Sequence, residues 1–256
     1  ATYTAGKSLI LDLLADMTPQ DMPWVSLYWV FTLLLLVMLI AVGVSHFPKI
    51  ELKEDEKSGS KDSYLALFKQ KYVWLFFLGI FCYVSTEQGT SIFMSTFLEQ
   101  YHGVNPQAEG AQAVSYFWGL MTAGCLVGMN LLKLIDSKRL LQVSGVLTIV
   151  LLLAALFGSK DVSLIAFPAI GFSISMMYSI VFSLALNSAS QHHGSFAGIL
   201  CSAIVGGAGG PMIVRTLAEA TTLRTGKLSI LLFVGFITFI GFWARPLINN
   251  KTISLK

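Results

Sequence analysis

The hydrophobic positions of this chain fall into seven long apolar stretches separated by short polar segments. Each stretch reaches or approaches the roughly 20 residues that a helix needs to cross a bilayer. They cover residues 24–46, 72–100, 111–135, 140–158, 162–187, 195–218 and 227–244. The pattern therefore predicts an all-α integral membrane protein with seven transmembrane helices.

Composition agrees with this prediction. The chain is 55% hydrophobic and only 12% charged, about half of the charged fraction that is usual for a soluble domain. The three cysteines all lie inside apolar stretches, so we expect free thiols rather than a disulfide framework.

The polar segments divide the chain. Residues 49–71 hold six lysines and several acidic residues around a Ser-Gly-Ser sequence, which is typical of a solvated flexible linker. Residues 1–23 are mixed and broken by prolines, and we interpret them as the end of an earlier span plus an extramembrane loop. Because the chain opens without an initiator Met or a signal peptide, we also expect it to be a fragment.

The distribution of positive charge predicts the orientation. Seven spans place alternate loops on opposite sides, and twelve of the 17 Lys and Arg residues then fall on one side. Cationic loops stay in the cytoplasm. We therefore expect the N-terminus of the chain outside and the C-terminus inside.

The spans are of two kinds. The first, fourth and seventh are uniformly apolar, as expected of helices that mostly face lipid. The second, third, fifth and sixth mix small and polar residues, which allow close approach of helices and require protein or water as neighbours. The sequence therefore predicts an inner group of four helices around a central cavity.

The second span carries a carboxylate near its middle. Glu87 would cost several kcal/mol at membrane depth unless it faces protein or a wet cavity, so it is a functional-site hypothesis by default. Removal from water also favours the protonated form of a carboxyl group, which makes Glu87 a candidate for proton coupling. The alternative is a structural hydrogen bond to a neighbouring helix.

Aromatic and hydroxyl-bearing residues accompany Glu87 on helical stripes of the second and fifth spans. An aromatic face can stack on the C–H face of a sugar ring while polar groups bind its hydroxyls. The alternative for most of these side chains is packing between helices. The residues that we expect to bind substrate are Tyr83, Glu87, Gln88, Ser91, Tyr116, Tyr178 and Phe182.

The sixth span contains a glycine-rich run that ends in proline. Such a run would bend the helix at a place where it lines a cavity or flexes, or would let it pack closely on a neighbour. We assign a candidate gating role to Gly206, Gly207, Gly210 and Pro211. The four histidines lie at span ends or in loops, and the sequence predicts no metal site, no cofactor and no nucleic-acid partner.

Three motifs resemble the fucose permease family, the fucose–galactose–glucose:proton symporters of the major facilitator superfamily. They are the Cys-Tyr-Val-Ser-Thr-Glu sequence at 82–87, Tyr-Ser-Ile-Val-Phe-Ser-Leu at 178–184, and Gly-Gly-Ala at 206–208 followed by Pro211. This sequence departs from the family pattern at two of its positions. It has Val127-Gly128 where the family usually has Gly-Arg, and Tyr178-Ser179 where the family has Tyr-Pro.

The resemblance implies an organisation for the chain. Residues 1–48 would be an outer loop and the last helix of an N-terminal bundle, 49–71 the cytoplasmic linker, 72–246 the C-terminal six-helix bundle, and 247–256 a cytoplasmic tail. The rest of the N-terminal bundle would be missing. The implied partners are a monosaccharide, a proton, the lipid bilayer and that missing bundle.

The resemblance also implies a function, which is sugar:proton symport across a bacterial inner membrane by alternating access, with L-fucose or a related monosaccharide as substrate. A non-transporting sugar sensor on the same fold remains open, because the basic residue of the third span is absent. A seven-helix receptor would have the same topology. The motifs that such receptors carry in the third and seventh spans are absent from this sequence. The sequence shows no acid–base pair at membrane depth, so it does not suggest an enzyme.

Overall fold

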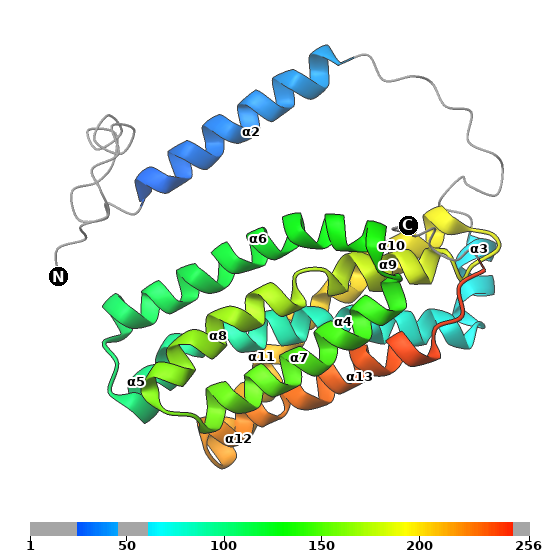
Figure 1. The fold of residues 1–256 in the computed structure, drawn as a ribbon. Coiled ribbons are helices and arrows are strands. Elements are labelled where there is room, and N and C mark those ends of the chain that lie inside the picture. Colours follow the sequence, from blue (N-terminus) through cyan, green and yellow to red (C-terminus); the bar gives the residue numbers. More distant parts are fainter. Residues whose placement is uncertain (1–24, 46–60, 248–256) are drawn as a thin grey trace. The chain divides into compact units, whose positions relative to one another are not determined.

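The computed structural model describes residues 25–45 and 61–247 (Figure 1). The chain divides into two units, Ala1–Glu51 and Leu52–Lys256. The described part of the first unit is centred on one apolar helix, α2 (Ser26–Val44). Nearly all of its described side chains are exposed, as expected of a helix whose packing partners are lipid or other helices.

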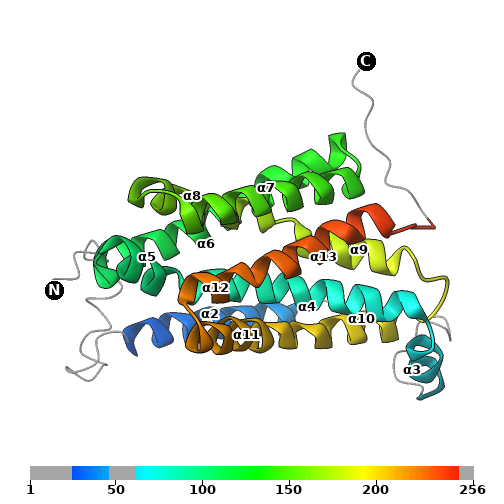
Figure 2. The ribbon, with the colours of Figure 1, turned by 90° about the horizontal axis from the view of Figure 1, so that it is seen from below.

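The second unit is a bundle of helices that run back and forth between two ends (Figures 1 and 2). Its elements are α3 (Lys61–Phe68), α4 (Lys71–Ser91), α5 (Met94–His102), the π-helical η3 (Pro106–Gly110), α6 (Ala111–Leu134), α7 (Ser137–Phe157), α8 (Lys160–Ile174), α9 (Met177–Leu186), α10 (His193–Ser202), the 3₁₀ turn η4 (Ala203–Val205), α11 (Gly206–Ala220), α12 (Leu223–Leu228) and α13 (Ile230–Trp243). No strand occurs among the described residues.

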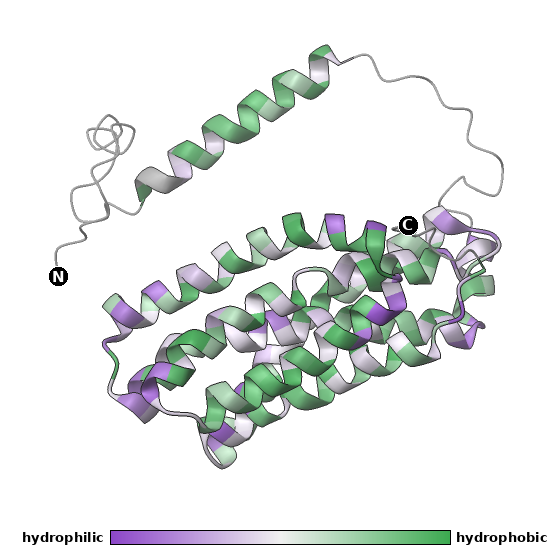
Figure 3. Cartoon of the chain, in the orientation of Figure 1, coloured by the Kyte–Doolittle hydropathy of each residue, from purple (hydrophilic) through white to green (hydrophobic). Residues whose placement is uncertain are grey.

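The predicted all-α membrane fold is confirmed. Five continuous or nearly continuous helical segments of the described chain are long and apolar enough to cross a membrane, and α3 with α4 would make a sixth. Hydrophobic residues dominate these segments and hydrophilic ones gather at their ends (Figure 3). Together with α2, these segments account for the seven apolar stretches.

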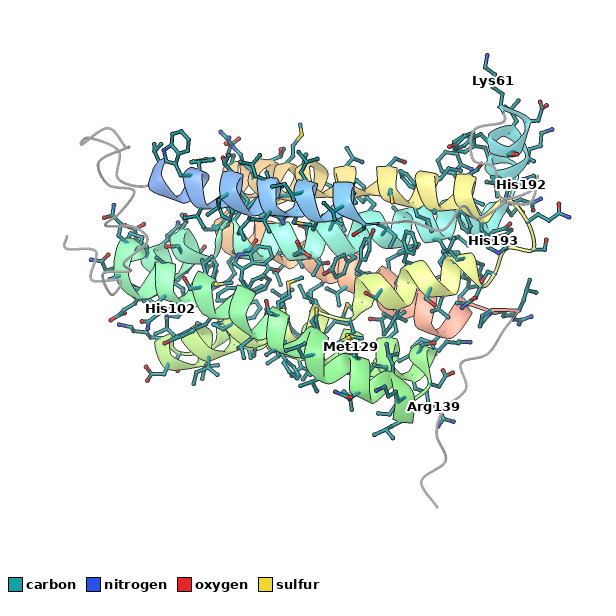
Figure 4. All side chains as sticks on the ribbon, turned by 90° about the horizontal axis from the view of Figure 1, so that it is seen from above. Lys61, His102, Met129, Arg139, His192 and His193 are labelled. Atoms are coloured by element: carbon teal, nitrogen blue, oxygen red, sulfur yellow. The ribbon has the colours of Figure 1, made fainter. Side chains whose placement is uncertain are left out.

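The two ends of the bundle can be followed by their labelled residues. His102 lies at one end, whereas Lys61, Arg139, His192 and His193 lie at the other (Figure 4). We refer to these as the His102 end and the Arg139 end.

Part of the segment predicted as a flexible linker is helical. Residues 61–68 form α3, which is bent by 87° from α4. Apolar side chains within this lysine-rich sequence explain the helix, because Leu67 is buried against the bundle. The bend is fixed by Trp74, whose indole Nε1 donates to the carbonyl oxygen of Phe68 over 2.9 Å.

Four predicted spans consist of two helical pieces rather than one. The breaks lie between α4 and α5, between α8 and α9, at η4, and between α12 and α13. The apolar pattern alone did not show them, because the residues at each break are as hydrophobic or as small as their neighbours.

Glycines bring α11 against α4, and α10 and α11 run alongside α4 (Figure 2). A Cβ at Gly210 would lie 2.5 Å from Ser85 Cα, and one at Gly206 would collide with the carbonyl of Phe81. Ser85 Oγ donates to the carbonyl oxygen of Gly206 over 3.0 Å. The backbones thus touch where side chains would hold them apart.

Lys227 is fully buried and has no acidic partner among the described residues. It lies on α12 at the His102 end, and its Nζ donates to the carbonyl oxygens of Thr90 (3.0 Å) and Gly89 (3.4 Å). It also lies 5.1 Å from the ring centroid of Phe167. Because the last carbonyls of a helix lack partners within it, Lys227 caps the end of α4.

The Gly210 contact yields a first prediction. Gly210→Ala should lower the free energy of unfolding by about 1–3 kcal/mol, because the neighbouring atoms are backbone and cannot rotate away. Gly235→Ala is the matched control, since a Cβ there meets nothing within 4 Å. Thermal unfolding in detergent would measure both, and equal melting temperatures for the two variants would contradict the packing argument.

The Lys227 cap yields a second prediction. Lys227→Met keeps the apolar length of the side chain but leaves two buried carbonyls without donors, so we expect a loss of about 1–3 kcal/mol in the free energy of unfolding. Lys160→Met is the control, because the ion pair of Lys160 with Glu109 is about half exposed and should contribute under about 1 kcal/mol. Unchanged stability of Lys227→Met in the same unfolding assay would rule out the cap.

Candidate functional site

Three aromatic rings from two helices form the centre of the candidate site. The rings of Tyr83 on α4 and Tyr178 on α9 have centroids 5.6 Å apart and are tilted by 58°. Tyr178 is stacked on Phe182, one turn further along α9, at 5.8 Å and 22°. Tyr83 is buried, whereas the other two rings are half-buried. The stack therefore presents aromatic surface outward from the core.

A carboxylate and an amide extend this site along α4. Glu87 follows Tyr83 by one helical turn, so the two side chains share a face. Gln88 Nε2 donates to Glu87 Oε1 over 2.9 Å, and both side chains are half-buried. No cation among the described residues forms an ion pair with Glu87. Glu87 thus interacts with Gln88 and with Tyr83 of the stack rather than with a cation of the described residues.

A break in the fifth predicted span positions Tyr178. The regular helix is interrupted at Ser175 and Met176, which both keep right-handed helical backbone angles, and α9 begins at Met177. Ser175 Oγ donates to the carbonyl oxygen of Phe172 over 2.8 Å, and the Cys125 thiol of α6 lies 3.5 Å from the carbonyl oxygen of Ser175. Polar side chains thus occupy carbonyls at the break, and Tyr178 follows within the first turn.

Two predicted substrate-binding residues lie apart from this cluster. The hydroxyl of Ser91 is directed at its own helix, with Oγ 3.5 Å from the carbonyl oxygen of Gln88, and the residue is only 5% exposed. Tyr116 is 55% exposed on α6 and accepts a hydrogen bond from Gln112 Nε2. The ring pairs of the described residues join Tyr83, Tyr178 and Phe182 and do not include Tyr116.

The glycine-rich run borders the site and packs on α4. A Cβ at Gly207 would lie 3.6 Å from Gln88 Cγ, so this glycine leaves room beside the polar pair. The helix α11 continues through Pro211, and the irregular turn precedes Gly206. Gly206 and Gly210 therefore allow close packing of α11 on α4. A gating role for the glycine-rich run stays a prediction.

The sequence analysis did not include two cysteines near the rings among the site residues. Cys125 and Cys201 are exposed thiols, and they lie within electrostatic range of Tyr83 and Tyr178, respectively. A single cysteine in an apolar helix carries no signal in the sequence, so only the packing reveals them. Among the described residues no group of three His, Cys, Asp or Glu side chains could hold a metal ion.

Comparisons with known proteins agree with this architecture. The Major Facilitator Superfamily profile matches residues 8–211. A glucose/galactose transporter of Brucella abortus biovar 1 (strain 9-941) is 29% identical over 244 residues, which are 92% of this chain and 58% of the relative. A Helicobacter pylori (strain J99) protein assigned to glucose/galactose transport is 31% identical over 229 residues, which are 89% of this chain and 54% of the relative.

Solved structures show the same fold. The crystal structure of a variant of the E. coli fucose:proton symporter FucP has a TM-score of 0.77 at 20% identity, covering 94% of this chain and 64% of that one. FucP in an outward conformation gives a TM-score of 0.74 at 19% identity, over 91% and 60% of the two chains.

The chain thus spans little more than half the length of these curated relatives, which are named as transporters rather than enzymes. The match over most of the described bundle, the sequence relatives and the shared fold lead to one conclusion. This multi-pass membrane chain belongs to the Major Facilitator Superfamily.

Proposed function

We propose that this chain forms the second part of a sugar:proton symporter, with L-fucose or a related monosaccharide such as glucose or galactose as substrate. One observation carries the proposal. The aromatic stack of Tyr83, Tyr178 and Phe182 lies beside the Glu87–Gln88 pair. The names of the relatives, which transport glucose and galactose or fucose with a proton, support the same class of substrate.

The stack suits the two kinds of surface on a monosaccharide. The half-buried rings of Tyr178 and Phe182 offer an apolar face to the C–H side of a pyranose ring. The Gln88 amide and the Tyr178 hydroxyl can donate to and accept from sugar hydroxyls. A neutral polyol needs such distributed polar groups and gains nothing from a cation, which agrees with the absence of an ion pair at the described site.

Glu87 is the proposed proton carrier. It is the carboxylate of the site, and neither of the two described ion pairs involves it. Protonation would give Glu87 an O–H donor for a sugar hydroxyl, while its carbonyl oxygen could still accept from Gln88.

Transport would require a partner bundle that faces this site. The exposed sides of the rings and of Glu87 would contact sugar from this half, and the other half would complete the cavity near the middle of the membrane. We place the protein in a bacterial inner membrane with the His102 end outside and the Arg139 end in the cytoplasm, because most Lys and Arg residues belong to the latter end. Gly206, Gly207, Gly210 and Pro211 would permit α11 to move against α4.

Glu87→Gln in the full-length transporter tests the proton proposal. We expect accumulation of sugar against its gradient to fall at least tenfold, with uptake no longer dependent on external pH, because an amide carries no exchangeable carboxyl proton. Exchange of internal for external sugar, which needs no net proton movement, should be largely kept. Uptake of labelled sugar into vesicles at several pH values would measure these quantities.

Glu99→Gln is the matched control, since Glu99 is an exposed carboxylate on the same predicted span. It should behave as the wild type. A Glu87→Gln transporter with the normal pH profile would show that the coupling group is elsewhere.

Tyr178→Ala tests the stacking role. Loss of the ring should weaken sugar binding about tenfold, as expected for the removal of one aromatic contact and one hydroxyl partner. Tyr178→Phe keeps the ring and should lose only the smaller part of the sugar affinity, which the hydroxyl group contributes. Equilibrium binding of sugar, measured by tryptophan fluorescence or calorimetry, separates the two effects, and equal affinities for wild type and Tyr178→Ala would contradict the site.

The same measurements distinguish a sensor from a transporter. A sensor would bind sugar with the expected dependence on Tyr178 but would exchange none across the membrane.

A further inference from the structure

A pocket with no role in the proposed transport site lies at the Arg139 end of the bundle. It has a volume of about 380 Å³ and is lined by Tyr72, Ser188, Phe242, Trp243 and Arg245. These residues come from the start of α4, the segment after α9, and the end of α13. Three spans therefore begin or end around it, which places the pocket at the boundary between lipid and water.

The walls of the pocket are well fixed. The ring of Tyr72 meets that of Phe196 edge-on at 5.8 Å, and Trp243 lies 5.7 Å from Phe76. The chain that follows α13 is fastened by a hydrogen bond from Leu247 N to the carbonyl oxygen of Asn187 over 2.8 Å. Arg245 is thus held close to the segment that carries Ser188.

The pocket has a polar side and an apolar side. Arg245 is exposed and forms no ion pair with any described residue, so its guanidinium is free to bind an anion. Ser188 and Tyr72 add hydroxyl groups, although the Ser188 hydroxyl already donates to the carbonyl oxygen of Leu184 and has only acceptor capacity left. Phe242 is 65% exposed on an otherwise apolar helix, as expected of a side chain in contact with acyl chains.

We propose that this pocket binds the phosphate-bearing headgroup of a membrane phospholipid, with its acyl chains lying along Phe242. Guanidinium groups bind phosphate oxygens in a planar, bidentate geometry. Tyr and Trp side chains are favoured at headgroup level. A soluble phosphate compound would bind to Arg245 but would leave the apolar wall of the pocket uncovered. A guanidinium beside an apolar wall therefore favours a lipid over a soluble phosphate compound.

This inference does not depend on the sugar proposal. It uses the membrane location of the bundle and the residues of one pocket, and none of them belongs to the Glu87 site.

The experiment is native mass spectrometry of the protein purified in detergent and supplied with defined lipids. Wild-type protein should retain one phosphatidylglycerol or phosphatidylethanolamine molecule, and Arg245→Gln should retain about tenfold less, because charge-assisted hydrogen bonds are lost. Arg139→Gln is the matched control. Arg139 is also an exposed arginine at this end (Figure 4), but it does not line the pocket.

Each further arm of the experiment has a decisive result. Equal retention of diacylglycerol, which lacks phosphate, would overturn the role of the headgroup, and equal binding of inorganic phosphate would overturn the lipid. Equal loss in Arg245→Gln and Arg139→Gln would show a general charge effect and refute the pocket. Arg245→Lys keeps the charge and should retain an intermediate amount of lipid; retention as low as for Arg245→Gln would also count against the proposal.

Discussion

Backbone polar groups cannot be left unpaired in a bilayer, and this constraint explains the polar contacts at the helix breaks of the bundle. An uninterrupted helix meets the requirement by itself, but each break frees carbonyls at membrane depth. At the end of α4 the ammonium of Lys227 occupies the carbonyls of Gly89 and Thr90. Near Ser175 a hydroxyl and a thiol occupy the carbonyls of the break between α8 and α9. At η4, Ser202 and Ser85 do the same for Ile199 and Gly206.

These breaks connect the fold to the candidate site. Glu87 lies one turn before the end of α4, and Tyr178 lies in the first turn of α9. Both helices are therefore interrupted close to the residues that we assign to sugar and proton.

The sequence predicted the type of fold well and the details unevenly. Apolar runs of about 20 residues are a strong signal, because lipid offers few alternatives. The same logic selected Glu87, Tyr83, Tyr178 and Phe182 as substrate-binding candidates, which stays a prediction, and the structure brings the three aromatic rings among them together. Ser91 was placed with them on spacing alone, but a serine can satisfy itself on its own helix.

Other features depended on packing between distant residues. The seventh apolar stretch begins at residue 227, and nothing nearby in sequence shows that Lys227 hydrogen-bonds to a helix 137 residues away. The helix α3 was not predicted, because it lies within a lysine-rich segment whose charged residues indicated a flexible linker. The close contact of Gly210 with Ser85 likewise belongs to two helices that are far apart along the chain.

The bond from Lys227 to α4 also bears on how the protein is made. The ribosome releases α4 well before it reaches α12, so newly inserted α4 stands in the bilayer with the carbonyls of Gly89 and Thr90 uncovered. Only the arrival of the last hairpin supplies the ammonium that covers them. A chain that stops short of Lys227 therefore lacks the donor that pairs these two carbonyls at the end of α4.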